Sequence, residues 1–246
     1  MKISLWTRFL DVIAPRLCVV CGNRLSAVEN TLCMVCYMHL PRLGRDNIPF
    51  EDNAMARMFW GLVPVERAAA LFHYSPHSDT SKILYEMKYH NRPDIGLDMG
   101  RMMARELMAE GFFDGIDYIV PVPLSAKRKR NRGYNQSDML AKGVAEITNI
   151  TIKDKLLLRK DFHGSQTLLN RWRRMENVKD VFLLKEEESL CHKHVLILDD
   201  VTDIHNLAAA QHICYGVDTQ RRDDHQNDGR EDAGECDGQS YFHKCC

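Results

Sequence analysis

Residues 194–202 read HVLILDDVT, and this stretch decides which kind of fold the chain adopts. Its consecutive apolar residues, Val195 to Leu198, are typical of a short parallel strand that is buried on both faces. Asp199 and Asp200 follow directly, at the end of the strand where open α/β sheets bind their ligands. Two adjacent carboxylates in this position can bind the vicinal hydroxyls of a ribose, or hold a Mg²⁺ ion that bridges to a phosphate.

A second predicted strand lies upstream and leads into the most basic segment of the chain. Residues 117–124 read DYIVPVPL, and a cluster of cations follows: Lys127, Arg128, Lys129, Arg130 and Arg132. The strand delivers this segment to the carboxyl edge of the sheet, where guanidinium and backbone NH groups can hold a polyanion. A solvated basic turn is the alternative interpretation, because most charge runs are simply exposed. In either case we expect residues 121–132 to form a loop.

Helix and strand patterns alternate through the same part of the chain. Apolar runs predict strands at residues 68–74 and 116–120, and amphipathic spacing predicts helices at 81–89, 95–108 and 136–147. This alternation favours an α/β fold with a mostly parallel sheet. Residues 41–53 contain proline, glycine and a polar run, which indicates a linker to the segment before them.

Two closely spaced cysteine pairs precede the linker. The spacing Cys18-x-x-Cys21 and Cys33-x-x-Cys36 allows four thiolates to surround one ion at about 2.3 Å per bond. A closed four-sulfur shell leaves no position for water, so we predict a structural Zn²⁺ site. A redox CxxC pair is the alternative, although such motifs are seldom doubled in so short a segment. The remaining five of the nine cysteines receive no role.

Composition narrows the class of protein without identifying a partner. The chain has 246 residues, 45% of them hydrophobic and 27% charged, and a formal net charge of −1, which predicts a soluble globular protein. Its charge gives no general attraction to nucleic acid or membranes, so any electrostatic recognition must be local.

Residues 1–16 predict an amphipathic helix in which Arg8 and Asp11 interrupt the apolar residues, unlike an export signal. We therefore expect a cytoplasmic protein with no membrane insertion.

Several motifs occur in the order that characterises a known family. The cysteine pairs are followed by Lys88-Tyr89, by IVPVPL at 119–124, by RGYNQ at 132–136, and by the acidic strand end. A further segment at 165–182 pairs Gln166 with downstream Arg174, Asn177 and Phe182. From Cys18 to Thr202 the chain resembles the ComF/GntX family, in which a four-cysteine module precedes a type I phosphoribosyltransferase-like domain.

The resemblance implies a fold and a substrate. It implies an α/β fold with a type I phosphoribosyltransferase-like parallel sheet at residues 46–216, after a helix and double zinc-ribbon-like module at residues 1–45. It further implies binding, and transfer, of phosphoribosyl pyrophosphate with Mg²⁺. Asp199 and Asp200 would then be the catalytic residues, and the substrate would be held by these two together with Arg128, Lys129, Arg132 and Thr202.

The same resemblance leaves a second, non-catalytic function open. ComF-type proteins are associated with competence and with incoming single-stranded DNA, which implies DNA and DNA-uptake proteins as partners. Lys127 and Arg130 would then contact phosphates, and Tyr134 would stack on a base. The two hypotheses differ in what they need, since catalysis requires a phosphate-binding loop after the acids and DNA binding requires only the basic segment.

The sequence departs from the family pattern after Thr202. Thr and Gly residues that would form the phosphate-binding turn are replaced by Asp203-Ile204-His205, which puts a negative charge where a phosphate should bind. Residues 217–246 contain no Leu, Ile or Met, so we expect a disordered tail and missing C-terminal strands. We interpret everything after about Thr202 as out of frame or degraded, and a truncated, inactive product is the third hypothesis.

Overall fold

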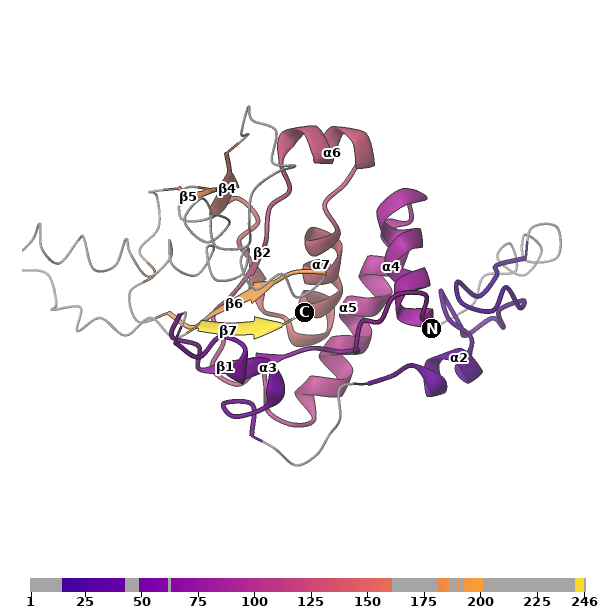
Figure 1. The fold of residues 1–246 in the computed structure, drawn as a ribbon, viewed down its shortest axis with the longest axis horizontal. Coiled ribbons are helices and arrows are strands. Elements are labelled where there is room, and N and C mark those ends of the chain that lie inside the picture. Colours follow the sequence, from indigo (N-terminus) through magenta and orange to yellow (C-terminus); the bar gives the residue numbers. More distant parts are fainter. Residues whose placement is uncertain are drawn as a thin grey trace, which may run out of the picture.

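The computed structural model describes residues 15–42, 49–61, 63–160, 181–185, 190 and 193–200, and the backbone of residues 242–245. It is a mixed α/β structure built on one parallel sheet (Figure 1). The strand order is β1-β7-β6-β2-β3, and every pairing is parallel. The strands are β1 (Arg67–Ala69), β2 (Tyr118–Pro121), β3 (Thr151–Ile152), β6 (Val195–Leu198) and β7 (Phe242–Cys245).

Strand β6 is the centre of the sheet. It pairs with β2 on one side and β7 on the other, and its residues alternate between the two faces. Leu196 and Leu198 belong to the core on one face, while Val195 and Ile197 belong to the core on the other. All four are fully buried, which explains why the predicted strand has no polar residue.

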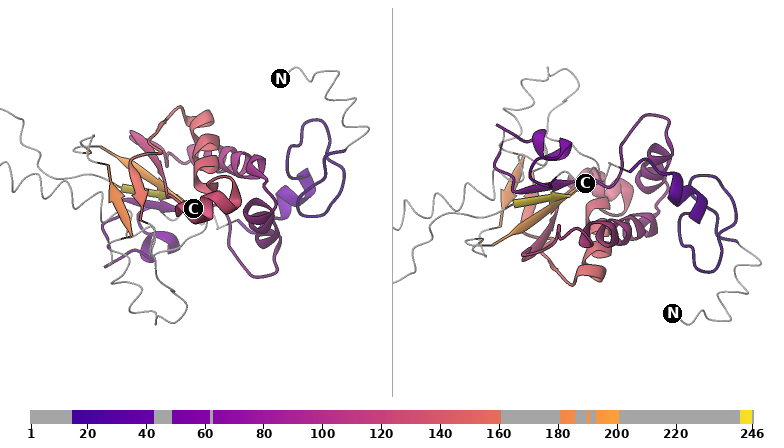
Figure 2. Two further views of the ribbon diagram at one scale, coloured as in Figure 1. Left: turned by 90° about the horizontal axis from the view of Figure 1, so that it is seen from above. Right: turned by 90° about the horizontal axis from the view of Figure 1, so that it is seen from below.

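Three helices cover one face of the sheet: α4 (Asp79–Tyr89), α5 (Pro93–Met108) and α7 (Gln136–Thr148) (Figure 2). Helices α5 and α7 pack with their backbones almost in contact. A Cβ atom at Gly100 would lie 2.1 Å from the carbonyl oxygen of Leu140, and one at Gly143 would lie 2.1 Å from that of Leu97. Only glycine permits this approach, so the two glycines fix the position of α7 against α5.

The opposite face carries a second core. It is covered by the short helix α3 (Ala54–Arg57) and by an antiparallel pair of strands, β4 (Leu157–Arg159) and β5 (Phe182–Leu184). Phe59 and Phe182 are its largest buried side chains. The sheet is therefore covered on both faces, as parallel sheets generally are.

The cysteine segment packs against the far side of α5 rather than standing apart. Its short helix α2 (Met34–His39) carries Tyr37, whose hydroxyl donates to Glu106 Oε1 over 2.9 Å. Arg42 lies over the Tyr37 ring and forms an ion pair with Glu106 at 3.1 Å. Leu32 and Leu40 extend the same core that lies beneath α5. This contact joins the module to the α/β domain.

Most predicted elements are confirmed. The structure has β6 over the predicted residues. Helices α4, α5 and α7 and strand β2 agree with the prediction to within two residues at each end. Strand β1 ends at Ala69, well before the predicted Tyr74. None of the helices in the described ranges has the length and hydropathy needed to cross a bilayer. The predicted helix at residues 1–16 lies outside the described residues apart from its last two positions.

Two predictions are wrong. Residues 121–132 are not all loop, because Ala126–Arg132 form helix α6. Ser125 caps it by accepting from the backbone NH of Arg128, and Gly133 ends it with φ +83°, while lysine and arginine are good helix formers. The tail was expected to provide no strand, yet β7 pairs with β1 and β6. Such pairing uses backbone groups, so it needs no apolar run.

Candidate functional site

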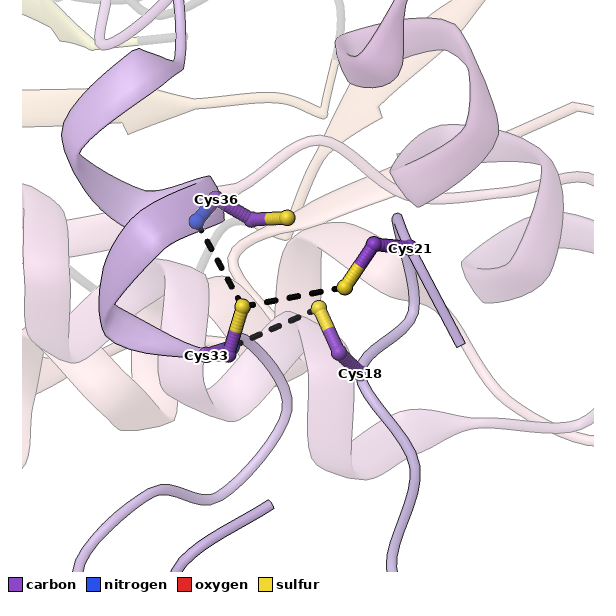
Figure 3. Close-up of side chains that lie close together, drawn as sticks. All are labelled: Cys18, Cys21, Cys33 and Cys36. Carbon is purple, nitrogen blue, oxygen red and sulfur yellow. Dashed lines mark hydrogen bonds between the residues drawn. The ribbon is translucent and has the colours of Figure 1, made fainter. Parts of the chain in front are cut away.

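The four predicted cysteine ligands converge on one point (Figure 3). Their Sγ atoms all lie within 4.8 Å of one another, and Cys21 and Cys33 are 3.7 Å apart. Sulfur atoms around a tetrahedral zinc ion lie about 3.8 Å apart when each bond is about 2.3 Å. Gly22, with φ +72°, makes the left-handed turn after the first pair. The arrangement therefore fits a structural metal ion such as zinc.

Backbone NH groups support the cluster. The NH of Cys33 donates to Cys18 Sγ and that of Cys36 donates to Cys33 Sγ, both at 3.4 Å. Burial raises the pKa of Cys18, but hydrogen bonds from backbone NH groups outweigh it and bring the pKa to about 7. Burial and the neighbouring thiols raise the pKa of Cys36 instead. Thiolates are the form that binds metal, so the turns already favour one ligand in that form.

The acidic pair lies at the carboxyl end of β6, where two helices reach it. Ser137, in the first turn of α7, donates its hydroxyl to Asp199 Oδ1 over 2.9 Å, and the backbone NH of Asp200 donates to the same oxygen over 2.8 Å. Lys88, near the end of α4, forms an ion pair with Asp200 Oδ2 at 2.8 Å. Three segments that are far apart in the sequence therefore meet at this edge.

Burial shifts the pKa of one of the two carboxyl groups. Burial raises the pKa of Asp199 to about 8, and the neighbouring Asp200 carboxylate acts in the same direction. Hydrogen bonds from Ser137 and from the backbone oppose this rise without cancelling it. The buried Asp199 carboxyl group therefore holds its proton more readily than a free aspartate, while the neighbouring Asp200 is held by its ion pair with Lys88.

The segment between α6 and α7 is held to the sheet by buried polar side chains. Asn135 Nδ2 donates to the carbonyl oxygen of Val122 over 3.0 Å and to Asp138 over 2.7 Å. Gln136 accepts a hydrogen bond from the Arg132 guanidinium. Asn135 and Gln136 are 4% and 1% exposed, so this segment is fixed rather than free to rearrange.

Helix α6 presents cations to solvent above this edge. Lys127, Arg128, Lys129 and Arg130 are all exposed, and none forms an ion pair within the part of the chain that the structure describes. Strands β2 and β6 are paired with Pro121 opposite Leu198, so the cations and the two acids leave the sheet at the same edge. The helix thus concentrates exposed positive charge after the same sheet edge as the acidic pair.

A mostly apolar cavity of about 420 Å³ opens beside Asp200. Methionines from α3, α4 and α5 line it, with Thr80 and His73 as polar neighbours: Met55, Met87, Met99 and Met103. Its size falls within the range of small-molecule pockets. Flexible thioether side chains can adapt to ligands of different shape, so the lining alone does not select one compound.

The structure places the predicted residues in three groups. The cysteines form one cluster, Asp199 and Asp200 a second, and α6 carries the four exposed cations. Tyr134 is half-buried, and its hydroxyl donates to the carbonyl oxygen of Met87. Thr202 and the segment at 165–180 lie outside the described residues.

Two residues of the acidic site were not among the predicted site residues. Lys88 was matched to a family motif but received no role, and Ser137 was passed over as the residue after RGYNQ. A lysine and a serine carry no signal by themselves. Their positions could have predicted their role in the site. Lys88 and Ser137 each lie at the end of a predicted helix that faces the carboxyl edge of the sheet.

Comparison with known proteins identifies distant relatives. The chain is 26% identical to the DNA utilization protein YhgH of Escherichia coli K12 over 193 residues, which are 75% of this chain and 77% of that protein. It is 26% identical to YhgH of Salmonella typhimurium over 199 residues, 76% of this chain and 85% of that protein. Competence protein F of Haemophilus influenzae is 22% identical over 193 residues, 75% of this chain and 83% of that protein. No family model and no solved structure matches the chain.

Proposed function

Because the chain is a distant homologue of the YhgH and ComF proteins, we propose that its parallel sheet is a phosphoribosyltransferase-like domain that binds phosphoribosyl pyrophosphate. The observation that carries this proposal is the acidic pair at the carboxyl end of the central strand, with α6 leaving the same edge. Carboxyl groups match the ribose hydroxyls, and exposed cations match the pyrophosphate. Neither feature requires the residues after Thr202.

The acidic pair fits ribose recognition because its two carboxyl groups have different partners. Asp200, which is ion-paired with Lys88, can accept hydrogen bonds from hydroxyls, whereas Asp199, whose pKa is raised, can donate one in its protonated form. In a transfer reaction the nucleophile would form a bond to the anomeric carbon as the bond to pyrophosphate breaks. Asp200 would stabilise the positive charge that develops on the ribose, and Arg128, Lys129 and Arg132 would hold the departing pyrophosphate.

A resident Mg²⁺ site does not fit the same residues. One Asp199 oxygen already accepts two hydrogen bonds, and Asp200 is paired with Lys88. Mg²⁺ takes several oxygen ligands in near-octahedral geometry and usually keeps its waters. We therefore assign magnesium to the substrate, as an ion that arrives bound to phosphoribosyl pyrophosphate.

The cavity beside Asp200 supplies a place for the acceptor. It opens next to the carboxylate that would contact the ribose, and its volume is enough for a ring-sized compound. The methionine lining favours an acceptor with a large apolar face. This assignment depends on phosphoribosyl pyrophosphate binding at the acidic pair.

Calorimetric titration of the zinc-loaded full chain with phosphoribosyl pyrophosphate and Mg²⁺ tests the proposal. We expect binding that Asp199→Asn together with Asp200→Asn abolishes, because the ribose contacts are lost. Asp114→Asn, an exposed acid in a distant turn, is the matched control and should bind normally. Folding of each variant is checked by its thermal melting curve. Absence of binding by folded wild-type protein would overturn the proposal.

A second function is favoured by the exposed cations of α6. These cations form no ion pair within the described residues, and they lie together on one short helix. A solvated turn would not need so many cations in one place. The names of the relatives refer to DNA utilization and competence. We therefore propose that α6 contacts the phosphates of a single-stranded nucleic acid. The metal at the four cysteines, which we propose to be Zn²⁺, would support the fold in either function.

A further inference from the structure

Two tyrosine rings are exposed side by side at the end of α4. Tyr85 and Tyr89 are 54% and 65% exposed, and their ring centroids are 4.9 Å apart with an interplanar angle of 44°. The ring of His90 lies 5.3 Å from that of Tyr85. Single exposed aromatic residues are ordinary on protein surfaces. Here three rings form one contiguous group at the end of a helix.

The rings are continuous with the cationic surface of α6. The Arg132 guanidinium carbon lies 6.0 Å from the centroid of the Tyr89 ring, and Arg132 is the last residue of α6. Tyr134, two residues later, donates its hydroxyl to Met87 on α4 and so fastens the two helix ends together. Figure 1 shows α4 and α6 at the same end of the molecule. Aromatic faces and unpaired cations therefore form one surface.

Two acidic residues beside the rings have contacts of their own. Glu86 accepts from His90 at 2.8 Å, and Asp94 is paired with Arg92 at 2.7 Å. The cations from Lys127 to Arg130 have no such partners among the described residues. A ligand that met this surface would encounter π faces at one end and net positive charge at the other.

We propose that Tyr85 and Tyr89 form a stacking platform for the bases of a single-stranded nucleic acid whose phosphates contact α6. A single strand offers both unpaired base faces and a regular row of phosphates, and proteins that bind it combine aromatic platforms with cationic grooves. A duplex hides its base faces, and an acidic peptide would use only the cations. The inference rests on the second proposed function and specifies where that function resides.

This assignment replaces the role expected for Tyr134. Its ring is half-buried and its hydroxyl is engaged by Met87, so it positions the segment rather than offering a free face. Burial also raises the pKa of Tyr134, in keeping with a neutral, structural hydroxyl. The hydroxyls of Tyr85 and Tyr89 make no hydrogen bond among the described residues, and both side chains remain more than half exposed beside Arg132 and His90.

The test is the affinity of the zinc-loaded full chain for a fluorescent oligodeoxythymidylate of about 12 nucleotides, measured over a range of salt concentrations. Tyr85→Leu with Tyr89→Leu should weaken binding about tenfold or more without changing the salt dependence, because stacking releases no counterions. Tyr85→Phe with Tyr89→Phe should restore the affinity, since phenylalanine keeps the π face. Trp60→Leu removes another exposed aromatic ring, which follows α3 rather than lying on α4, and it should not change the affinity.

A second pair of variants separates the platform from the cations. Lys127→Gln with Arg130→Gln should reduce the slope of log affinity against log salt by about 1.4, since each phosphate contact on a single strand contributes about 0.7. If these variants weaken binding but the leucine variants do not, α6 binds nucleic acid and the platform inference is wrong. If wild-type protein binds neither this oligomer nor a matching oligouridylate, both fail. A duplex that binds as tightly as the single strand also contradicts the platform.

Discussion

The four-cysteine site and the acidic site are assembled from very different lengths of chain. All four sulfur ligands come from residues 18–36, and their geometry depends on two local turns and the start of α2. The acidic site instead joins Lys88 from α4, Ser137 from α7 and Asp200 from the end of β6. The first site is therefore a property of a short segment, and the second is a property of the packed domain.

This difference determines what holds each site together. The cysteine site has few large buried side chains of its own, so a bound metal ion would supply much of its stability. The acidic site is held by helices that pack against the sheet. It contains a buried carboxyl group, whose burial costs free energy rather than stabilising the fold. Changes that affect one site should leave the other largely intact.

The largest effect is expected from removing the metal. Cys18→Ser with Cys33→Ser should abolish metal binding and lower the stability of the module by more than about 3 kcal/mol, because structural metal binding is coupled to folding. Atomic emission gives the metal content, and thermal melting with and without a chelator gives the stability. Cys214→Ser, which removes a cysteine that belongs to neither CxxC pair, serves as the control and should retain one metal ion per chain.

Retention of β-sheet signals and of phosphoribosyl pyrophosphate binding in the cysteine variant would support the separation of the two sites. A chain purified under mild conditions that contains no metal, and melts at the same temperature with chelator, would contradict the zinc assignment.

A smaller but substantial effect is expected at the contact between α5 and α7. Gly143→Ala would place a methyl group 2.1 Å from the carbonyl oxygen of Leu97, so the helices must separate. We expect a loss of about 2–3 kcal/mol in the free energy of unfolding. Because α7 carries Ser137, the acidic site should be disturbed while the metal content stays the same. Urea unfolding and metal analysis measure the two outcomes.

Lys142→Ala provides the matched control on the same helix, since this side chain is exposed and its loss should cost less than about 0.5 kcal/mol. Equal stability of the Gly143→Ala variant and the wild type would show that α5 and α7 do not approach as closely as described.

The same contrast explains how much the sequence predicted. Strand β6 and the cysteine cluster were predicted because each is encoded by neighbouring residues: an uninterrupted apolar run in one case and a fixed spacing in the other. The acids were predicted for the same reason. Lys88 was not assigned to the site, because its contact with Asp200 exists only after α4 has packed on the sheet.

Helix α6 and strand β7 show two further limits. A run of lysine and arginine is compatible with a loop or a helix, and only the capping residues Ser125 and Gly133 decide between them. The pairing of β7 with β1 and β6 uses backbone groups, which leave no pattern in the sequence. Local rules therefore gave the elements, while pairing partners and long-range contacts needed the structure.

The smallest effect sharpens the comparison at the acidic site itself. Because the pKa of Asp199 is raised from 3.8 to about 8 on folding, the folded chain keeps a proton that the unfolded chain releases between these pH values. Its contribution to stability is therefore complete below about pH 4 and is lost as the pH rises to about 8. Asp199→Asn does not titrate, so this variant should gain about 1–2 kcal/mol relative to the wild type between pH 7 and pH 8.5.

Urea unfolding at several pH values within that window measures the effect and avoids the acidic range in which cysteine ligands would release a metal. Asp154→Asn, an exposed acid, should change neither the stability nor its pH dependence. A constant difference between Asp199→Asn and the wild type across the window would mean that Asp199 is already ionised in the folded chain. An ionised Asp199 next to Asp200 would favour a bound divalent cation at this site over the direct ribose contacts proposed above.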